Sequence, residues 1–265
     1  MTGQPPRAIV VVPTYAEAAC IGALLTRLRA VADVDVLVVD DDSPDETREI
    51  VHERAAAVGG IHLLHRRGHR GYASACIDGF VWALQRGYDA IAQMDADLSH
   101  CPETVPHLLA GLDHADLVIG SRYVSGGSTT GWPWHRRALS RWANRYARLV
   151  LRLKPADVTS GFRAYRADHL CRLRLDEAKA EGYAFLVEML MVAELAGARV
   201  EEVAIEFSDR SHGKSKMSGR IVLEAIFLIT KWALRRPALA RSVAQDATAD
   251  ADAGAMAPEP DNRSH

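Results

Sequence analysis

Short apolar runs alternate with longer amphipathic stretches through the first half of this chain. The apolar runs are compact, which is typical of buried strands, and they lie at 8–12, 34–39, 61–64, 90–94 and 117–120. The stretches between them have helical periodicity. They lie at about 17–32, at 72–86 and at 102–112, and another follows the apolar run 34–39 and ends at about 58. Strands that alternate with helices through short connections predict an α/β fold, in which a mostly parallel central sheet is flanked by helices.

The second half departs from this rhythm. Residues 123–134 are rich in Gly, Ser and Thr, which is typical of a loop that moves as a lid. Helices are predicted at 136–152, from 182 to about 195 and at 217–236, with a strand at 199–207 and a charged, flexible loop at 208–216. We expect a short flexible N-terminus over 1–7, one domain over 8–237, and a disordered tail rich in Ala, Asp and Pro over 238–265.

Length and composition narrow the class of protein. At 265 residues the chain can form one large α/β domain, and a formal net charge of −2 gives no reason to expect a nucleic-acid partner. The four cysteines include no Cys-X-X-Cys pair, so we expect no zinc site or disulfide framework, and a reducing compartment. Residues 1–7 lack the apolar core of a signal peptide, and charged residues interrupt the longest apolar stretch, 221–234. We expect a protein that is soluble or attached peripherally to a membrane.

Two carboxylates stand at the end of the fourth predicted strand. Residues i and i+2 of a strand point to the same side, so Asp95 and Asp97 can face one space, with Ser99 and His100 behind them. Two like charges that close repel each other unless a cation lies between them, and a hard divalent ion such as Mg²⁺ or Mn²⁺ suits oxygen ligands. The alternative is that Asp95 caps the following helix and Asp97 is solvated in a loop.

Polar clusters follow every predicted strand of the first half. They lie at 13–17, 40–42, 68–71, 95–99 and 121–123. Ser43 is also expected to cap the helix that ends near Val58, with Pro44 at its first position. Because the carboxyl ends of parallel strands meet at one edge of a sheet, we expect the active site at that edge.

The helix predicted at 136–152 has a basic stripe. At about 100° per residue, the stripe contains Arg137, Arg141, Arg145, Arg148 and Arg152. The opposite side carries Leu139, Trp142, Ala143, Tyr146, Leu149 and Leu153. The stripe is either an ordinary solvated face or a surface for anionic lipid headgroups or a phosphorylated substrate.

Several motifs, in this order, resemble those of one family. They lie at 13–17, 39–45, 93–102, 120–123, 159–166, 182–188 and 209–217, and the most specific are Asp-Ala-Asp-Leu-Ser-His at 95–100, Ser-Gly-Phe-Arg at 160–163 and Arg-X-X-Gly-Lys-Ser-Lys at 210–216. Together they resemble the polyprenol-phosphate (dolichol-phosphate) mannose synthases, family-2 glycosyltransferases with the GT-A fold. The resemblance covers about residues 7–237.

The resemblance implies a role for individual residues. The donor nucleotide sugar would be bound by Pro13, Tyr15, Glu17, Val39, Asp41, Asp95, Ala96 and Asp97, and by Arg210 and Lys216 at its phosphates. Mg²⁺ or Mn²⁺ would be held by Asp97, Asp95 and Ser99, and the acceptor phosphate by Arg122, Arg136 and Ser140. Asp95, Asp97, Arg122 and Arg136 would be the catalytic residues.

The chain also departs from the family's pattern. Ala16 stands where the family usually has Asn, Glu46 replaces a frequent Gly, and residues 71–75 replace a more glycine-rich loop. None of these positions is an implied metal ligand, but affinity for the donor could differ.

The reaction implied by the resemblance moves mannose from GDP-mannose to polyprenyl or dolichyl phosphate, with inversion at the anomeric carbon. A phosphate with its second pKa near 6 is already deprotonated at neutral pH, so no strong general base is required, and Glu188 is expected to orient or support the site instead. The lipid acceptor implies peripheral attachment at the cytoplasmic face of a membrane, through the arginine stripe and the helix near 221–236, beside an integral-membrane partner protein.

Three other functions remain as alternatives. One is a transferase that uses UDP-glucose or another nucleotide sugar, because an aspartate can bind the ring N–H of either base. A non-catalytic subunit that binds nucleotide sugars is the second, and a plain structural module is the third.

Overall fold

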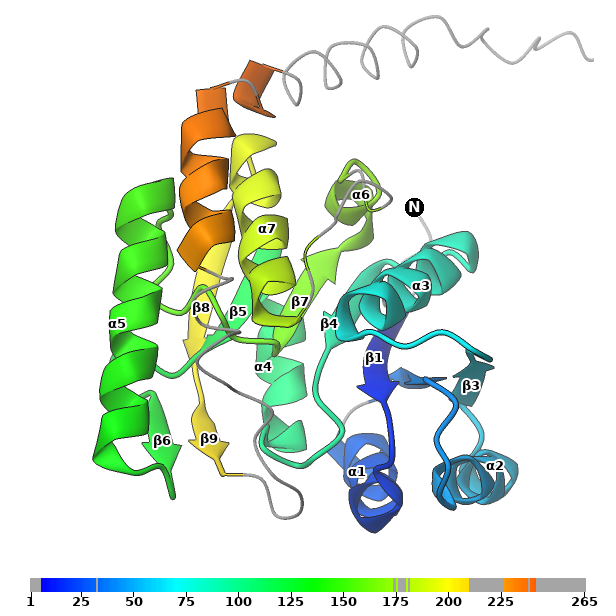
Figure 1. Ribbon diagram of the computed structural model, residues 1–265. Helices are drawn as coiled ribbons and strands as arrows, with labels where there is room; N and C mark the ends of the chain where they lie inside the picture. Colours follow the sequence, from blue (N-terminus) through cyan, green and yellow to red (C-terminus); the bar gives the residue numbers. More distant parts are fainter. Residues whose placement is uncertain are drawn as a thin grey trace, which may run out of the picture.

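A seven-stranded sheet forms the centre of the computed structural model, which describes residues 6–31, 33–173, 175, 180, 182–209, 226–237 and 239–241 (Figure 1). Its strands are β1 (Ala8–Thr14), β2 (Asp35–Asp40), β3 (Ile61–His65), β4 (Ala90–Gln93), β5 (Leu117–Ser121), β7 (Arg163–Arg166) and β8 (Val200–Ala204). They lie in the order β3-β2-β1-β4-β7-β5-β8, and every neighbouring pair is parallel except the two that involve β7. The predicted α/β fold with a mostly parallel sheet is confirmed.

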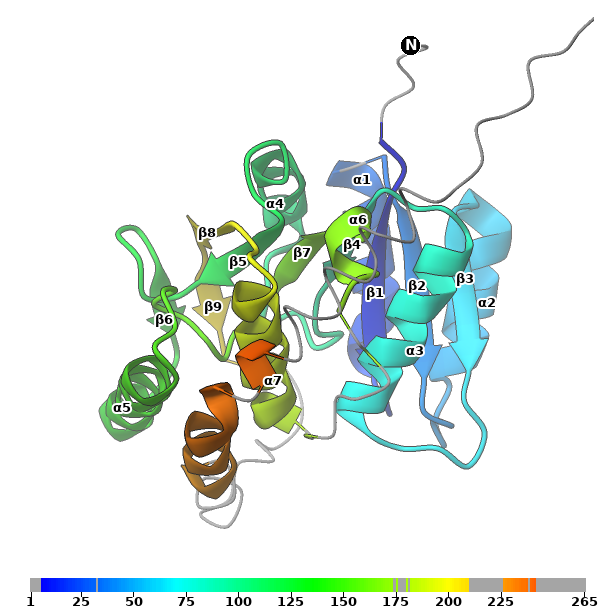
Figure 2. The same ribbon diagram turned by 90° about the horizontal axis from the view of Figure 1, so that it is seen from above.

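Helices cover both faces of this sheet (Figure 2). They are α1 (Ala18–Val31), α2 (Thr47–Val58), α3 (Tyr72–Gln85), the 3₁₀ turn η1 (Pro102–Thr104), α4 (Val105–Gly111), α5 (Trp134–Leu151), α6 (Ala167–Leu170), α7 (Gly182–Leu195) and a C-terminal helix over 226–237. Alternate residues of β1 point to opposite faces, so Val10 packs with the layer of α1, α2 and α4 while Val11 packs with the layer of α3 and α7. The sheet is therefore buried on both sides, which explains its continuous apolar runs.

A small second sheet pairs β6 (Ser128–Thr130) with β9 (Glu206–Ser208) in parallel. The single strand predicted over 199–207 is therefore wrong, because the chain leaves the central sheet at Ile205. The N–H of Ile205 donates to the carbonyl of Ser121 at 3.0 Å, while its carbonyl accepts from the N–H of Ser128 at 2.9 Å. The segment 123–134, expected to be a loop throughout, likewise contributes β6.

The predicted cap of α2 is also wrong. The helix begins at Thr47, and the carboxylate of Asp45 accepts from the Thr47 N–H at 3.2 Å. The Ser43 hydroxyl instead accepts from the N–H of Ala16 at 2.9 Å and donates to the carboxylate of Asp40. Ser43 thus joins two loops at the edge of the sheet rather than capping a helix.

Helix α5 faces the core with a side that the apolar pattern did not indicate. Its buried residues are Asn144, Ala147 and Leu151, whereas Trp142 is 50% and Leu149 67% exposed. The predicted tail and N-terminus lie largely outside the described residues, as does the first part of the helix expected at 217–236. None of the helices in the described ranges has the length and apolar character needed to cross a bilayer.

Ala16 adopts a backbone conformation that is unfavourable for alanine, with φ of 58°. A left-handed conformation costs an L-residue about 1–2 kcal/mol, and asparagine tolerates it better than other residues that carry a Cβ. We expect Ala16→Asn to raise the thermal unfolding midpoint by about 1–3 °C, measured by circular dichroism.

The same substitution at exposed Ala23, in the middle of α1, is the matched control. It should lower the midpoint, because asparagine is a poorer helix former than alanine by roughly 0.7 kcal/mol. Equal shifts at the two positions would contradict the assignment of strain to Ala16.

Candidate active site

Hydrogen bonds hold the loops after β1 and β2 together at the carboxyl edge of the sheet. Besides the bond from Ala16 to Ser43, the N–H of Glu17 donates to Thr47 Oγ1 at 3.0 Å and the N–H of Ala18 donates to Asp45 Oδ2 at 3.1 Å. Backbone donors of one loop thus bond to side-chain oxygens of the other. The implied donor residues in these two loops are therefore fixed relative to one another.

The implied wall of the donor site differs in exposure along its length. Pro13 and Tyr15 are half-buried, and the guanidinium of Arg70 lies 4.6 Å from the centre of the Tyr15 ring. Val39 is fully buried, and its side chain packs against Gly79 of α3. Only the backbone of Val39 can therefore face a ligand, while Tyr15 offers its side chain.

Asp41 lies at the end of β2 and is nearly buried. Its Oδ2 accepts from the N–H of Gly71 at 2.8 Å, and its Oδ1 lies 2.9 Å from Nη1 of Arg66, itself also paired with Asp78. Burial raises the pKa of Asp41 against the opposing effects of the Gly71 hydrogen bond and the Arg66 charge. The pair places a hydrogen-bond acceptor beside a donor at this position, which is a pattern that a nucleobase edge can match.

The tip of β4 brings acidic side chains close to a buried hydroxyl. Asp97 is 3% exposed, and its Oδ1 accepts from the N–H of Ser99 at 3.0 Å. Leu98 between them has φ of 60°, so the turn is strained. The Ser99 hydroxyl is buried without a hydrogen-bond partner among the described residues.

The two alternatives for these carboxylates do not fit this geometry. The 3₁₀ turn η1 has Cys101 at its N-cap and no side-chain capping bond, so Asp95 does not cap it, and Asp97 is buried rather than solvated. The oxygens of two carboxylates and of the Ser99 hydroxyl are suitable ligands for Mg²⁺ or Mn²⁺. Among the described residues, no three or more His, Cys, Asp or Glu side chains lie close enough together to hold a metal ion by themselves.

His100 supports the same tip from behind. The N–H of Asp95 donates to His100 Nδ1 at 3.3 Å, and the imidazole stacks on Phe162 with its centroid 4.9 Å away. Complete burial lowers the pKa of His100, although Asp95 and Asp97 oppose this shift. The ring is therefore held neutral, which its role as acceptor at Nδ1 requires.

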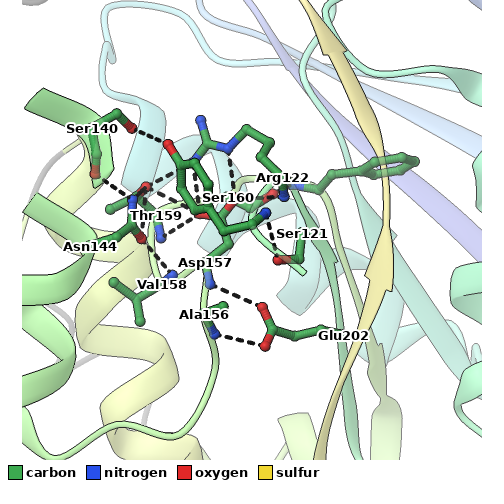
Figure 3. A network of polar contacts seen from close by, with 12 residues as sticks. Ser121, Arg122, Ser140, Asn144, Ala156, Asp157, Val158, Thr159, Ser160 and Glu202 are labelled. Atoms are coloured by element: carbon green, nitrogen blue, oxygen red, sulfur yellow. Dashed lines mark hydrogen bonds and ion pairs between the residues drawn. The ribbon is translucent and has the colours of Figure 1, made fainter. Parts of the chain in front are cut away.

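The end of β5 carries a buried ion pair between Arg122 and Asp157 (Figure 3). Nε of Arg122 donates to Asp157 Oδ2 at 2.6 Å and Nη2 donates to Oδ1 at 2.7 Å. Burial raises the pKa of Asp157, but attraction to Arg122 and the hydrogen bonds outweigh it, so the pKa lies below its ordinary value. Glu202 accepts from the N–H groups of Ala156 and Asp157 at 2.7 and 3.0 Å and fixes the loop that carries the aspartate.

The same network reaches α5. Arg122 also donates to Thr159 Oγ1 at 2.9 Å, which accepts from Nδ2 of Asn144 at 3.1 Å. Asn144 Nδ2 donates in addition to the carbonyl of Ser140 at 3.0 Å, and the hydroxyl of Tyr123 donates to Ser140 Oγ at 2.7 Å. The implied acceptor residues Arg122 and Ser140, 18 positions apart in the sequence, thus belong to one polar network.

Aromatic rings connect Arg122 with the third implied acceptor residue. The Trp132 ring lies 4.1 Å from the guanidinium of Arg136 and 5.6 Å from that of Arg122, and Arg136 pairs with Asp209 at 2.8 Å. Phe207 lies 5.4 Å from the Arg122 guanidinium and, in an edge contact, 5.2 Å from His100. The acidic tip of β4 and the arginine cluster therefore lie on either side of one aromatic cluster.

The structure brings together most of the implied site residues and adds several that the sequence did not indicate. The additions share buried or half-buried polar contacts at this edge, and they are Arg66, Tyr72, Gln93, Asn144, Asp157 and Thr159. Arg66 lies two residues before the polar cluster at 68–71, and Asn144 is one helical turn from Ser140, so both had a weak signal. Arg210 and Lys216 lie outside the described residues.

Known proteins resemble this chain over most of its length. It is 47% identical over 229 residues to the undecaprenyl-phosphate mannosyltransferase of Micrococcus luteus, which covers 86% of this chain and 94% of that protein. It is 42% identical over 232 residues to the polyprenol monophosphomannose synthase of Mycolicibacterium smegmatis, covering 86% and 88%. Among solved structures, glucosyl-3-phosphoglycerate synthase from Mycobacterium tuberculosis in complex with Mn²⁺, UDP and glucosyl-3-phosphoglycerate has a TM-score of 0.59 at 19% identity, covering 87% of this chain and 79% of that one.

The last comparison shows a likeness of fold, and it agrees with the GT-A architecture expected from the motifs. The family model described as Glycosyl transferase family 2 matches residues 9–173. This range contains the strands from β1, without its first residue, through β7, and it includes the acidic tip of β4. This chain belongs to glycosyl transferase family 2.

Proposed function

We propose that this protein is a polyprenol monophosphomannose synthase, which transfers mannose from GDP-mannose to the phosphate of a polyprenyl or dolichyl lipid with inversion. The observation that carries the proposal is the position of the Arg122, Arg136 and Ser140 cluster beside the acidic tip of β4. An acidic tip suits a metal-bound diphosphate, and an arginine cluster suits a second anion. The two relatives of 47% and 42% identity carry names that describe polyprenol-phosphate mannosylation.

The acceptor chemistry agrees with the residues present. A lipid monophosphate is an anion at neutral pH, so it can attack the sugar without a general base. Glu188, the carboxylate that could be mistaken for such a base, accepts a hydrogen bond from the N–H of Ala180 at 3.0 Å. Arg136 would bind the acceptor phosphate, and Arg122, whose orientation Asp157 fixes, would lie on the side that faces the donor.

Asp97, Asp95 and Ser99 would hold Mg²⁺ or Mn²⁺. The ion, when bound, supplies positive charge that stabilises the diphosphate leaving group. The neutral His100 and the burial of Asp97 keep this corner low in dielectric, which strengthens the attraction between the chain's groups and the donor phosphates. Arg210 and Lys216 are proposed to bind these phosphates as well.

The membrane surface is proposed to be the protein's partner, at the cytoplasmic face and beside an integral-membrane protein. On α5 the exposed Trp142 and Leu149 lie about half a turn around the helix from buried Asn144 and Ala147, and the exposed Leu139 lies between these two sides. The C-terminal helix 226–237 lies beside α5 in Figures 1 and 2, and the Tyr146 and Thr230 hydroxyls are 2.8 Å apart.

The face of the protein that is proposed to bind the membrane carries both apolar and charged side chains. Phe227 and Leu234 of the C-terminal helix are 67% and 82% exposed, which extends the apolar area of α5. The exposed Arg137, Arg141 and Arg145 flank that area. Apolar side chains bordered by arginines suit insertion among anionic lipid headgroups.

The proposed reaction is tested with labelled GDP-mannose, polyprenyl phosphate and Mn²⁺, by following label into an organic phase. Asp97→Asn should lower the rate by at least about 100-fold, because the ion that stabilises the diphosphate leaving group would lose an anionic ligand. The control is Asp113→Asn, at an exposed aspartate beyond α4. Wild-type transfer from UDP-glucose but not from GDP-mannose would favour the rival donor, and an unaffected Asp97→Asn rate would favour a different site.

The acceptor site is tested by a neighbouring pair of arginines. Arg136→Gln should raise the KM for polyprenyl phosphate about tenfold or more and leave the KM for GDP-mannose within about twofold, since a charge-assisted bond contributes roughly 1.5–3 kcal/mol. Arg137→Gln removes the adjacent exposed charge and is the matched control, with substrates supplied in detergent micelles. Equal effects of the two substitutions would contradict a specific role for Arg136.

Membrane attachment is tested by flotation with vesicles that contain anionic lipid. The variant Trp142→Ser/Leu149→Ser/Arg145→Glu should remain at the bottom of the gradient, because it loses apolar insertion and headgroup attraction together. The control is Val58→Ser/Arg54→Glu, which makes one apolar-to-serine and one arginine-to-glutamate change at exposed positions of α2. Flotation of the first variant at the wild-type level would refute attachment through this surface.

A further inference from the structure

Tyr72, the first residue of α3, is bonded to two residues at the end of β4. Its hydroxyl donates to Asp95 Oδ1 at 3.1 Å and accepts from Nε2 of Gln93 at 2.8 Å. Gln93 is the last residue of β4, and Asp95 lies two positions beyond it. Tyr72 bridges them from the neighbouring helix.

The direction of these bonds is fixed by the groups involved. A phenol has one hydrogen to donate, and an amide nitrogen can only donate, so the Gln93 bond leaves the phenol hydrogen for Asp95. The phenol of Tyr72 therefore donates to Asp95 while it accepts from Gln93.

Gly161 leaves the space in which this bond forms. A Cβ at position 161 would lie 2.6 Å from the Tyr72 hydroxyl oxygen and 3.4 Å from Asp95 Oδ1. The backbone of Gly161 is not in the left-handed region, so the need for glycine here is steric. The glycine of the Ser-Gly-Phe-Arg motif is thus explained by contact with Tyr72.

We propose that Tyr72 is a positioning residue for Asp95, which holds this carboxylate in the orientation needed for the metal-bound diphosphate, and that Gly161 provides the room for it. The inference rests on the proposed function of the β4 tip. It gives a role to one of the positions, 71–75, at which the chain departs from the glycine-rich loop of the family that it resembles. A rigid aromatic side chain replaces backbone flexibility there, and it is bonded directly to Asp95.

The test measures GDP binding by calorimetry, in MnCl₂ and separately in EDTA. Tyr72→Phe should weaken GDP binding about fivefold or more in MnCl₂ and by less than about twofold in EDTA, because Asp95 acts through the metal. Tyr88→Phe is the matched control, since it also removes a tyrosine–aspartate hydrogen bond, to Asp35 at the start of β2. It should leave both affinities unchanged.

A second variant tests the steric part. Gly161→Ala should weaken GDP binding in MnCl₂ more than Tyr72→Phe does, and Gly161→Ala/Tyr72→Phe should recover part of that loss because the colliding oxygen is gone. Equal affinities of wild type and Tyr72→Phe in MnCl₂, or equal losses in MnCl₂ and EDTA, would overturn the proposal. Binding needs neither mannose nor lipid, so a wild-type protein that makes no mannolipid would refute the proposed function and leave this result standing.

Discussion

Charged side chains are buried at the carboxyl edge of the sheet, and the site depends on the requirement that each of them has partners there. A buried ion costs several kcal/mol unless a partner and hydrogen bonds compensate it. Asp157 is therefore paired with Arg122 on both carboxylate oxygens. Arg163 is fully buried, and its guanidinium donates to the carbonyls of Val158, Ser160 and Leu186. Each of these requirements fixes a stretch of backbone, so the loop 157–162 is determined by the charges on either side of it.

The same loop connects the two halves of the site. Its Thr159 bonds to Arg122 and Asn144 on the proposed acceptor side, whereas its Gly161 and Phe162 contact Tyr72 and His100 on the proposed donor side. A shift of this loop would therefore move the arginine cluster and the acidic tip together. In the proposed transfer, the nucleotide-sugar donor and the lipid-phosphate acceptor are both anions, and they must approach each other without either being screened by water. Support from one shared loop keeps the reacting groups in register.

The sequence predicts those features that follow from local pattern, and it misses those decided by distant partners. The five apolar runs and the position of Asp95 and Asp97 after the fourth run need only periodicity and chain order. Strand β7 was missed because Arg163-Ala-Tyr-Arg166 has two arginines, and only carbonyls from other segments make burial of the first acceptable. A serine at position 43 can either cap a helix or bond to a neighbouring loop, and only the fold decides which of the two its hydroxyl does.

Helix α5 illustrates the same limit and connects the site with the proposed membrane surface. An apolar side of a helix normally identifies the side that packs on the core, yet here Asn144 and Ala147 face inward and Trp142 faces outward. Asn144 is acceptable inside because Val158, Thr159 and Ser140 satisfy its amide. Because this polar network occupies the inward side of α5, the apolar Trp142 and Leu149 lie on another surface of the helix. In the proposed reaction, one helix would carry Ser140 and Arg136 for a phosphate and Trp142 and Leu149 for acyl chains, which is the arrangement that an amphiphilic acceptor requires.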